Sequence, residues 1–171
     1  GRGPMVVLID DSDSMDGAPA TFARATALAL ADVALADKRA VRLVRFSHKL
    51  NGVLDIRPGR TRLDEVLAFM AGPTDGGTNF ALPLGLARGT IESESVFERA
   101  DVVLITDGEA ELGWDFLSGW KALEKQTGLT TWAVHIGASA PEVLHQLTDE
   151  VVQLKDLDEK KLTDALLGRA Q

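Results

Sequence analysis

Three short, almost uninterrupted apolar runs, rich in β-branched residues, constrain the fold of this chain more than any other feature. They are residues 6–9, 102–105 and 131–136. Such runs are typical of strands buried on both faces, as in a parallel sheet covered on each side by helices. Helix-length segments lie between and after them, at 21–38, 63–70, 81–91, 114–126 and 159–169. The alternation predicts an α/β fold with a doubly wound, mainly parallel central sheet.

One segment breaks this alternation. The run at 41–46 is followed, after a short stretch, by Asn51-Gly52 and then by a second apolar run at 53–56. Asn-Gly is the strongest short signal for a two-residue hairpin turn, because both residues tolerate positive φ. We therefore expect Asn51-Gly52 at the tip of a hairpin whose second strand runs antiparallel at a sheet edge.

The composition limits what the chain can be and bind. With 171 residues, of which 45% are hydrophobic and 26% charged, residues 1–171 fit one globular domain. A net charge of −8 repels phosphate backbones and anionic lipid surfaces, so we expect neither nucleic acid nor a membrane as a partner. The chain has no cysteine, which fits a reducing, cytoplasmic location. Its abrupt start on a strand suggests a domain cut from a longer protein.

Oxygen-bearing side chains follow two of the predicted strands. The first strand is followed by Asp10-Asp11-Ser12-Asp13-Ser14-Met15-Asp16-Gly17, and the strand at 102–105 by Thr106-Asp107-Gly108-Glu109. Between them in the chain, Asp75-Gly76-Gly77-Thr78-Asn79 opens a helix. Because ligands of open α/β sheets lie beyond the carboxyl ends of the strands, we expect these loops to form the functional edge.

The donors in these loops are the hydroxyls of Ser12, Ser14 and Thr78 and the carboxylates of Asp10 and Asp107. Hard oxygen donors in an incomplete shell suit Mg²⁺, and also Mn²⁺ or Ca²⁺. Neutral hydroxyls leave the cation with residual positive charge and an open position for a carboxylate from outside. The sequence therefore predicts a cation site that docks an Asp or Glu of a protein partner.

The pattern Asp10-x-Ser12-x-Ser14, then Thr78 after two glycines, then Asp107 in Thr-Asp-Gly, resembles the complete metal-ion-dependent adhesion site of von Willebrand factor A (VWA) domains. The expected order of elements, with its one antiparallel strand, also resembles that fold, so the resemblance covers essentially the whole chain. It implies that Ser12, Ser14 and Thr78 contact the metal, while Asp10 and Asp107 act directly or through water.

Within this superfamily, several segments are most similar to bacterial ViaA/CoxE-like proteins. These are Gly3-Pro4, the Ala-rich first helix, Arg45-Phe46-Ser47 and Gly76-Gly77-Thr78. Members of that group are adaptors for MoxR-type AAA+ ATPases. The resemblance implies a non-enzymatic adaptor, with a MoxR-type AAA+ ATPase as a candidate partner.

The first loop departs from the family pattern, which usually reads Asp-x-Ser-Gly-Ser-Met with an uncharged second residue. Asp11 and Asp13 here add two carboxylates. We expect five carboxylates to crowd this region and to repel one another when no cation is bound. They are those of Asp10, Asp11, Asp13, Asp16 and Asp107. The sequence leaves open whether Asp13 reaches the metal, points to solvent or occupies the place of the ligand.

A second hypothesis is a Mg²⁺-dependent phosphohydrolase. Asp11-x-Asp13 after an apolar strand is similar to haloacid dehalogenase-type phosphatases, in which the first Asp is the nucleophile and the second the general acid. Asp107 would then help to hold Mg²⁺. However, Met15 stands where that pattern expects Thr or Val, and no suitable Lys can be placed. A VWA scaffold with an empty site is the third hypothesis, since each site residue alone could be a helix cap.

Other activities have less support. An EF-hand fails because Met15 and Asp16 occupy ligand and glycine positions. The turn containing Ser139 lacks the last glycine of a nucleophile elbow, and no phosphate-binding glycine loop is present. The three histidines are too scattered for a metal cluster. Trp114 and Trp120 follow the Asp107 loop, and we expect both in the core, with Trp114 also a candidate contact at the rim of the site.

Overall fold

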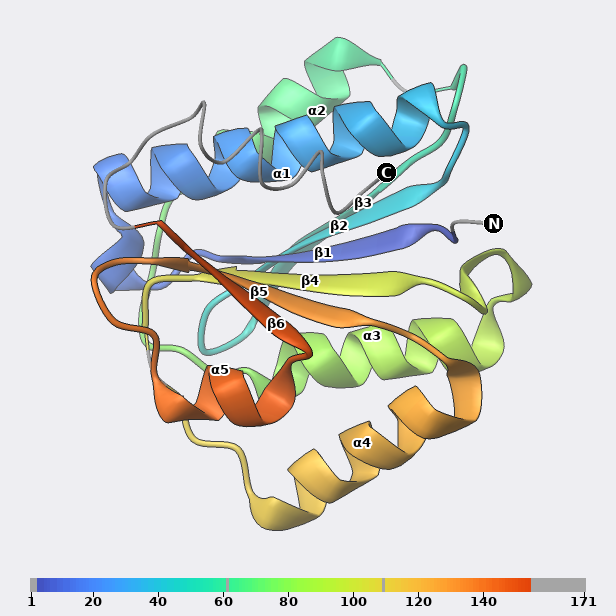
Figure 1. Cartoon of the computed structure of the whole chain (residues 1–171). Coiled ribbons are helices and arrows are strands. Elements are labelled where there is room, and N and C mark those ends of the chain that lie inside the picture. Colours follow the sequence, from blue (N-terminus) through green and yellow to red (C-terminus); the bar gives the residue numbers. More distant parts are fainter. Residues whose placement is uncertain (1–2, 61, 109, 155–171) are drawn as a thin grey trace.

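In the part of the chain that the structure describes, six strands form one sheet in the order β3-β2-β1-β4-β5-β6 (Figure 1). This computed structural model describes residues 3–60, 62–108 and 110–154. The strands are β1 (Met5–Asp10), β2 (Val41–Phe46), β3 (Leu50–Ile56), β4 (Asp101–Thr106), β5 (Thr131–Ile136) and β6 (Glu150–Leu154). All neighbouring pairs are parallel except β2 and β3. The predicted mainly parallel sheet with one antiparallel edge strand is confirmed.

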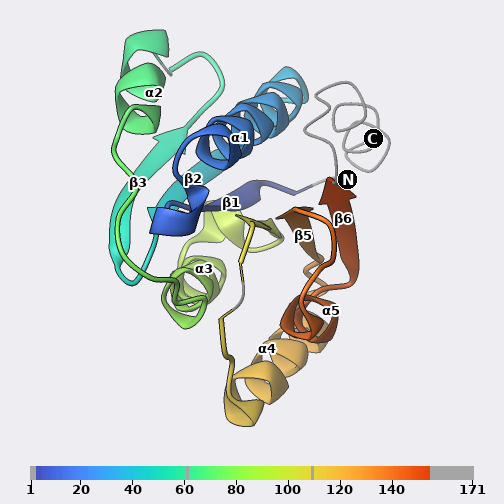
Figure 2. The same cartoon turned by 90° about the vertical axis from the view of Figure 1, so that its left-hand side faces the viewer.

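Helices cover both faces of the sheet (Figures 1 and 2). They are α1 (Ala18–Ala36), α2 (Leu63–Met70), α3 (Ala81–Ser93), α4 (Trp114–Thr127) and α5 (Glu142–Leu147), with short 3₁₀ turns η1 (Asp13–Met15) and η2 (Ser95–Phe97). Helices α1 and α2 lie on one face, and α3, α4 and α5 on the other. Side chains of β1 alternate between the two cores: Val7 faces α1, whereas Leu8 faces α3. This double burial explains the uninterrupted apolar runs.

Strand register brings the loops after β1, β2 and β4 to the same edge of the sheet. Asp10 lies beside Phe46 of β2, and Ile9 lies beside Ile105 of β4. The loops that follow Asp10 and Thr106 therefore start next to each other, although almost one hundred residues separate them.

The predicted hairpin exists, but its predicted tip is wrong. The turn is formed by residues 47–49, and Asn51 and Gly52 lie within β3, where Gly52 pairs with Arg45. Neither residue has positive φ. Tertiary contacts outweigh the local turn preference: the Asn51 amide donates to Asp75, and a Cβ on Gly52 would lie 3.0 Å from the ring of Phe69.

Helix α1 begins earlier than the predicted residue 21, and β6 was not predicted. By length and composition α1 is apolar enough to cross a membrane, the one such helix among the residues described. In the fold it packs on the sheet and buries Ala23, Ala27 and Leu30, as a core helix does. The helix predicted at 159–169 lies outside the described residues.

Candidate metal site

Asp10, the last residue of the central strand β1, is fully buried at the carboxyl edge of the sheet. Its Oδ1 accepts a 2.8 Å hydrogen bond from the backbone N–H of Ser12, and its Oδ2 accepts a 2.6 Å hydrogen bond from the hydroxyl of Thr106. Burial raises the pKa of Asp10 above its usual value, these hydrogen bonds lower it in part, and the nearby charge of Asp107 raises it further. Asp10 is thus a buried acid held in one orientation.

A row of hydroxyls leads from this acid to the next strand. The Oγ atoms of Ser12 and Ser14 are 3.3 Å apart, and the Ser14 hydroxyl donates a 2.9 Å hydrogen bond to Oδ1 of Asp107. The Ser residues belong to the loop after β1, and Asp107 follows β4. Four of the five predicted site residues therefore form one hydrogen-bonded group at this edge.

The loop that carries Thr78 is tied to the same edge by three backbone hydrogen bonds. Asp13 N–H donates to Gly76 O at 2.8 Å, Asp75 N–H to Asp11 O at 2.9 Å, and Asn79 N–H to Ser47 O at 2.9 Å. Thr78 is half-buried and lies in the chain between Asp75 and Asn79, whose N–H groups make two of these bonds. The fifth predicted residue is therefore held beside the loop that carries Ser12 and Ser14.

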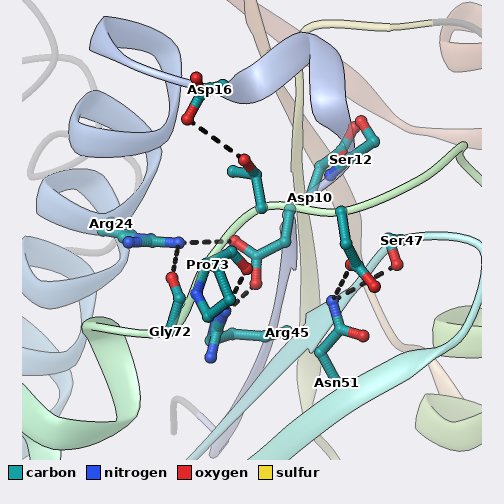
Figure 3. A network of polar contacts seen from close by, with 12 residues as sticks. Asp10, Ser12, Asp16, Arg24, Arg45, Ser47, Asn51, Gly72 and Pro73 are labelled. Carbon is teal, nitrogen blue, oxygen red and sulfur yellow. Dashed lines mark hydrogen bonds and ion pairs between the residues drawn. The ribbon is translucent and has the colours of Figure 1, made fainter.

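Glycine is needed at position 76 of this loop. Its φ is +62°, a conformation that L side chains rarely adopt, and an added Cβ would lie 2.1 Å from Nδ1 of His48. The loop is also held through Asp75, which accepts a 3.1 Å hydrogen bond from Asn51, a residue labelled in Figure 3. Asp75 also pairs with Lys49 at 3.4 Å. Hydrogen bonding from Ser47, then from Asn51 and Lys49, lowers the pKa of Asp75.

The expected crowding of five carboxylates is wrong, because Asp11 is neutralised. Its buried side chain turns toward α1 and β2, where it pairs with Arg24 at 3.2 Å and with Arg45 at 2.5 Å. Burial raises the pKa of Asp11, and the two arginines oppose that rise. Asp13 and Asp16 are exposed, and Asp16 accepts a 3.3 Å hydrogen bond from Thr74. The carboxylates that face each other at the site are those of Asp10 and Asp107.

The sequence reasoning missed three residues that shape this edge: Thr106, Arg24 and Arg45. A signal for Arg45 was present, because Val41 and Leu43 share its face of β2 and both belong to the core beneath α1. A charged residue on such a face needs a buried counter-charge. Nothing local marked Thr106, whose role depends on the pairing of β1 with β4.

Of the tryptophans, Trp120 is buried in the core, as expected, and its indole donates to Thr131. Trp114 is 78% exposed at the start of α4, so its predicted place in the core is wrong. His48 and His145 are exposed and His135 is buried. Burial lowers the pKa of His135, while nearby Asp107 raises it in part. His135 therefore lies near the site, which its position in the sequence did not indicate.

The donor chemistry of the site fits a divalent cation. Among the residues described, Asp10 makes no ion pair with Lys, Arg or His, and the charged group that shifts its pKa is a second acid, Asp107. No group of three or more Asp, Glu, His or Cys side chains in the described ranges is arranged around a metal position. Hydroxyls would therefore have to complete the shell, for which Ser12, Ser14 and Thr78 remain the predicted donors.

A mainly parallel sheet with helices on both faces and oxygen donors gathered beyond β1 and β4 defines a Rossmann-like α/β domain with its binding edge at the strand carboxyl ends. The chain belongs to the von Willebrand factor type A domain family, whose model matches residues 5–109. This match spans Asp10, Ser12, Ser14, Thr78 and Asp107.

Relatives and solved structures agree with this family. The chain is 29% identical over 160 residues to the uncharacterized protein MJ0811 of Methanocaldococcus jannaschii, covering 94% of the chain and 36% of that protein. It is 34% identical over 111 residues to regulatory protein ViaA of Proteus mirabilis, covering 64% of the chain and 22% of ViaA. A von Willebrand factor type A structure from Catenulispora acidiphila superposes with a TM-score of 0.72 at 20% identity, covering 99% of the chain and 42% of that structure. The chain thus spans less than half of each of these proteins.

Proposed function

We propose that this chain is a divalent-cation-dependent protein-binding module. The observation that carries the proposal is Asp10: a fully buried carboxylate with no cationic side chain paired to it in the described part of the chain, next to a second acid and a row of hydroxyls. Burying a charge without a counter-charge is costly. A bound Mg²⁺, Mn²⁺ or Ca²⁺ offsets that cost and explains why two acids face each other here.

The roles of the residues follow from their contacts. Ser12, Ser14 and Thr78 would hold the cation through hydroxyl oxygens, with Asp10 and Asp107 binding directly or through water. Thr106 and the Ser12 N–H orient the Asp10 carboxylate, so this side chain does not rotate away when the site is empty. When bound, the cation supplies a positive charge that attracts an Asp or Glu of a protein partner.

The kind of partner is supported by sequence similarity. The chain is similar to a region of ViaA, which is named as a regulatory protein, and its motifs resemble ViaA/CoxE-like adaptors. We therefore propose that it acts as a cytoplasmic adaptor whose partner is a MoxR-type AAA+ ATPase. The edge around the metal site is the surface that would meet this partner.

The geometry disfavours the phosphohydrolase hypothesis. A nucleophilic Asp must be accessible to the phosphate, whereas Asp11 is fully buried and paired with two arginines. A phosphoester therefore has no path to its carboxylate in this fold. Steady turnover of small phosphoesters that disappears in Asp11→Asn would instead favour the phosphohydrolase over the binding module.

Melting curves test whether the site takes a cation. Binding to the folded state alone adds RT ln(1 + [L]/Kd), about 2.7 kcal/mol at a hundredfold excess over Kd. We expect Mg²⁺ or Mn²⁺ to raise the melting temperature relative to EDTA, and Asp107→Asn to lose most of this rise. Asp115→Asn on the exposed start of α4 is the charge-matched control. If none of Mg²⁺, Mn²⁺ and Ca²⁺ raises the melting temperature, the chain is a VWA scaffold whose site does not bind a cation.

A further inference from the structure

The side chain directly after Asp10 in the chain pairs with two arginines, and we call Asp11, Arg24 and Arg45 the arginine clasp. Both arginines are labelled in Figure 3. The three residues come from the loop after β1, from α1 and from β2. Their side chains are 0%, 19% and 8% exposed. The clasp is thus a mostly buried ionic group that joins three elements of the fold.

The clasp also holds the segment that leads to Thr78. Arg24 Nη2 bridges Asp11 and the carbonyl of Gly72, to which it donates at 2.6 Å. Arg45 donates to the carbonyls of Phe69 and Pro73, each at 3.1 Å. Together the two guanidinium groups fix the end of α2 and the start of residues 71–80.

The packing around these contacts leaves little room for movement. A Cβ on Gly72 would lie 2.0 Å from Nη1 of Arg45, so the backbone passes directly against the guanidinium group. On the other side, the Asp11 carbonyl accepts from Asp75 N–H at 2.9 Å. Asp11 therefore contacts the Thr78 loop through its backbone and, by way of both arginines, through its side chain.

We propose that Asp11 is a positioning residue, which acts through Arg24 and Arg45 to hold the Thr78 loop at the distance that the metal site requires. The inference rests on the proposed function, since it assigns Asp11 a role toward the same site. It differs from the expectation for an extra anionic residue in the first loop: the Asp11 carboxylate is counter-ion to the arginines and not part of the charge that the cation meets.

Replacing Arg24 distinguishes a positioning role from a simple charge effect, because the two predict opposite changes in cation affinity. If the clasp acted only through its charge, removing the positive Arg24 would strengthen cation binding. If it positions the loop, Arg24→Gln loses the bonds to Asp11 and Gly72 and weakens binding. Replacing a residue that orients a metal ligand without binding the metal itself typically lowers metal affinity 10- to 100-fold. We therefore expect Arg24→Gln to lower cation affinity about tenfold.

The experiment compares Mn²⁺ affinity, followed by the electron paramagnetic resonance signal of free Mn²⁺, in wild type, Asp11→Asn, Arg24→Gln and Asp13→Asn. Asp13→Asn removes the same charge from the same loop at an exposed position. We expect about a tenfold or greater loss for Asp11→Asn and Arg24→Gln, and at most about fivefold for Asp13→Asn, the upper range for an exposed charge pair. Arg24→Gln serves alone if Asp11→Asn does not fold.

Amide hydrogen exchange in the metal-free protein supplies an independent readout. We expect Arg24→Gln to speed exchange at the Asp13 and Asp75 amides, which bond across the two loops, but not at Asp101 N–H, which bonds to Pro4 O at the opposite edge. Unchanged exchange, or tighter Mn²⁺ binding by Arg24→Gln, would overturn the positioning role. If the wild type binds none of Mn²⁺, Mg²⁺ and Ca²⁺, the proposed function is instead rejected.

Discussion

The hydroxyl of Ser14 donates a 2.9 Å hydrogen bond to Oδ1 of Asp107, which lies 93 residues further along the chain. This bond joins the loop after β1 to the loop after β4 at the carboxyl edge of the sheet. Both side chains are candidate ligands of one cation, so the bond brings two of the proposed ligands together.

Replacing Ser14 should separate binding from folding. Ser14→Ala removes one candidate ligand and a hydrogen bond at an exposed position, so the free energy of unfolding should change by less than about 1 kcal/mol. Mn²⁺ affinity should fall by at least about tenfold. Titration calorimetry and urea unfolding measure the two effects, with Ser118→Ala on the exposed face of α4 as the control. Equal affinity in both variants would remove Ser14 from the site.

Thr106 should stabilise the buried acid beside it. Thr106→Val keeps the shape but removes the 2.6 Å bond to Asp10 and the acceptor of Gly108 N–H. Leaving buried polar groups unpaired should cost about 1–3 kcal/mol of unfolding free energy. Thr26→Val is a matched control, because the buried Thr26 hydroxyl donates only within its own helix. Urea unfolding in EDTA compares the two, and equal losses would deny Thr106 a special role.

The conformation of the Thr78 loop predicts different results for adjacent glycines. Gly76→Ala places a side chain at φ +62°, which should cost about 1–2 kcal/mol. Exposed His48 can swing aside, so backbone strain is the main cost. Gly77→Ala meets no atom within 4 Å and its φ is not positive, so it should be nearly neutral. Thermal unfolding and Mn²⁺ titration of both variants check this, and a neutral Gly76→Ala would contradict the backbone geometry.

Glu124 on α4 should make stability depend on pH near neutrality. Burial, with the neighbouring Asp149, raises its pKa from 4.5 to about 7, although Lys121 opposes the rise. The folded state therefore binds this proton more tightly than the unfolded state. Its contribution is fully present below pH 4.5 and is lost as pH rises through 7. At about 1.4 kcal/mol per pKa unit, the loss is at most a few kcal/mol.

Glu124→Gln should remove this part of the pH dependence. Urea unfolding at pH 5 and pH 8 should show wild type losing more stability than the variant between the two values. Glu65→Gln on the exposed surface of α2 controls for the lost charge. Parallel losses in wild type and Glu124→Gln would show that the Glu124 proton does not contribute.

Much of the architecture was predictable because the pattern of apolar residues along the chain indicates the strands and helices. Uninterrupted apolar runs indicate strands buried on both faces, and the predicted helix 63–70 has the same bounds as α2. Prediction failed where tertiary contacts override local preference. Asn51-Gly52 has the sequence of a tight turn, yet hydrogen bonding to Asp75 and packing on Phe69 place both residues within a strand.

The sequence by itself determined the sheet class, the family resemblance and the candidate donors Asp10, Ser12, Ser14, Thr78 and Asp107. Only the tertiary structure decided what each carboxylate faces. Asp10 and Asp11 are adjacent in the chain, but Asp10 meets Thr106 and Asp107 while Asp11 meets Arg24 and Arg45. The physical reason is that the groups around a buried carboxylate set its pKa and its pairing, and those groups come from strands and helices distant in the sequence.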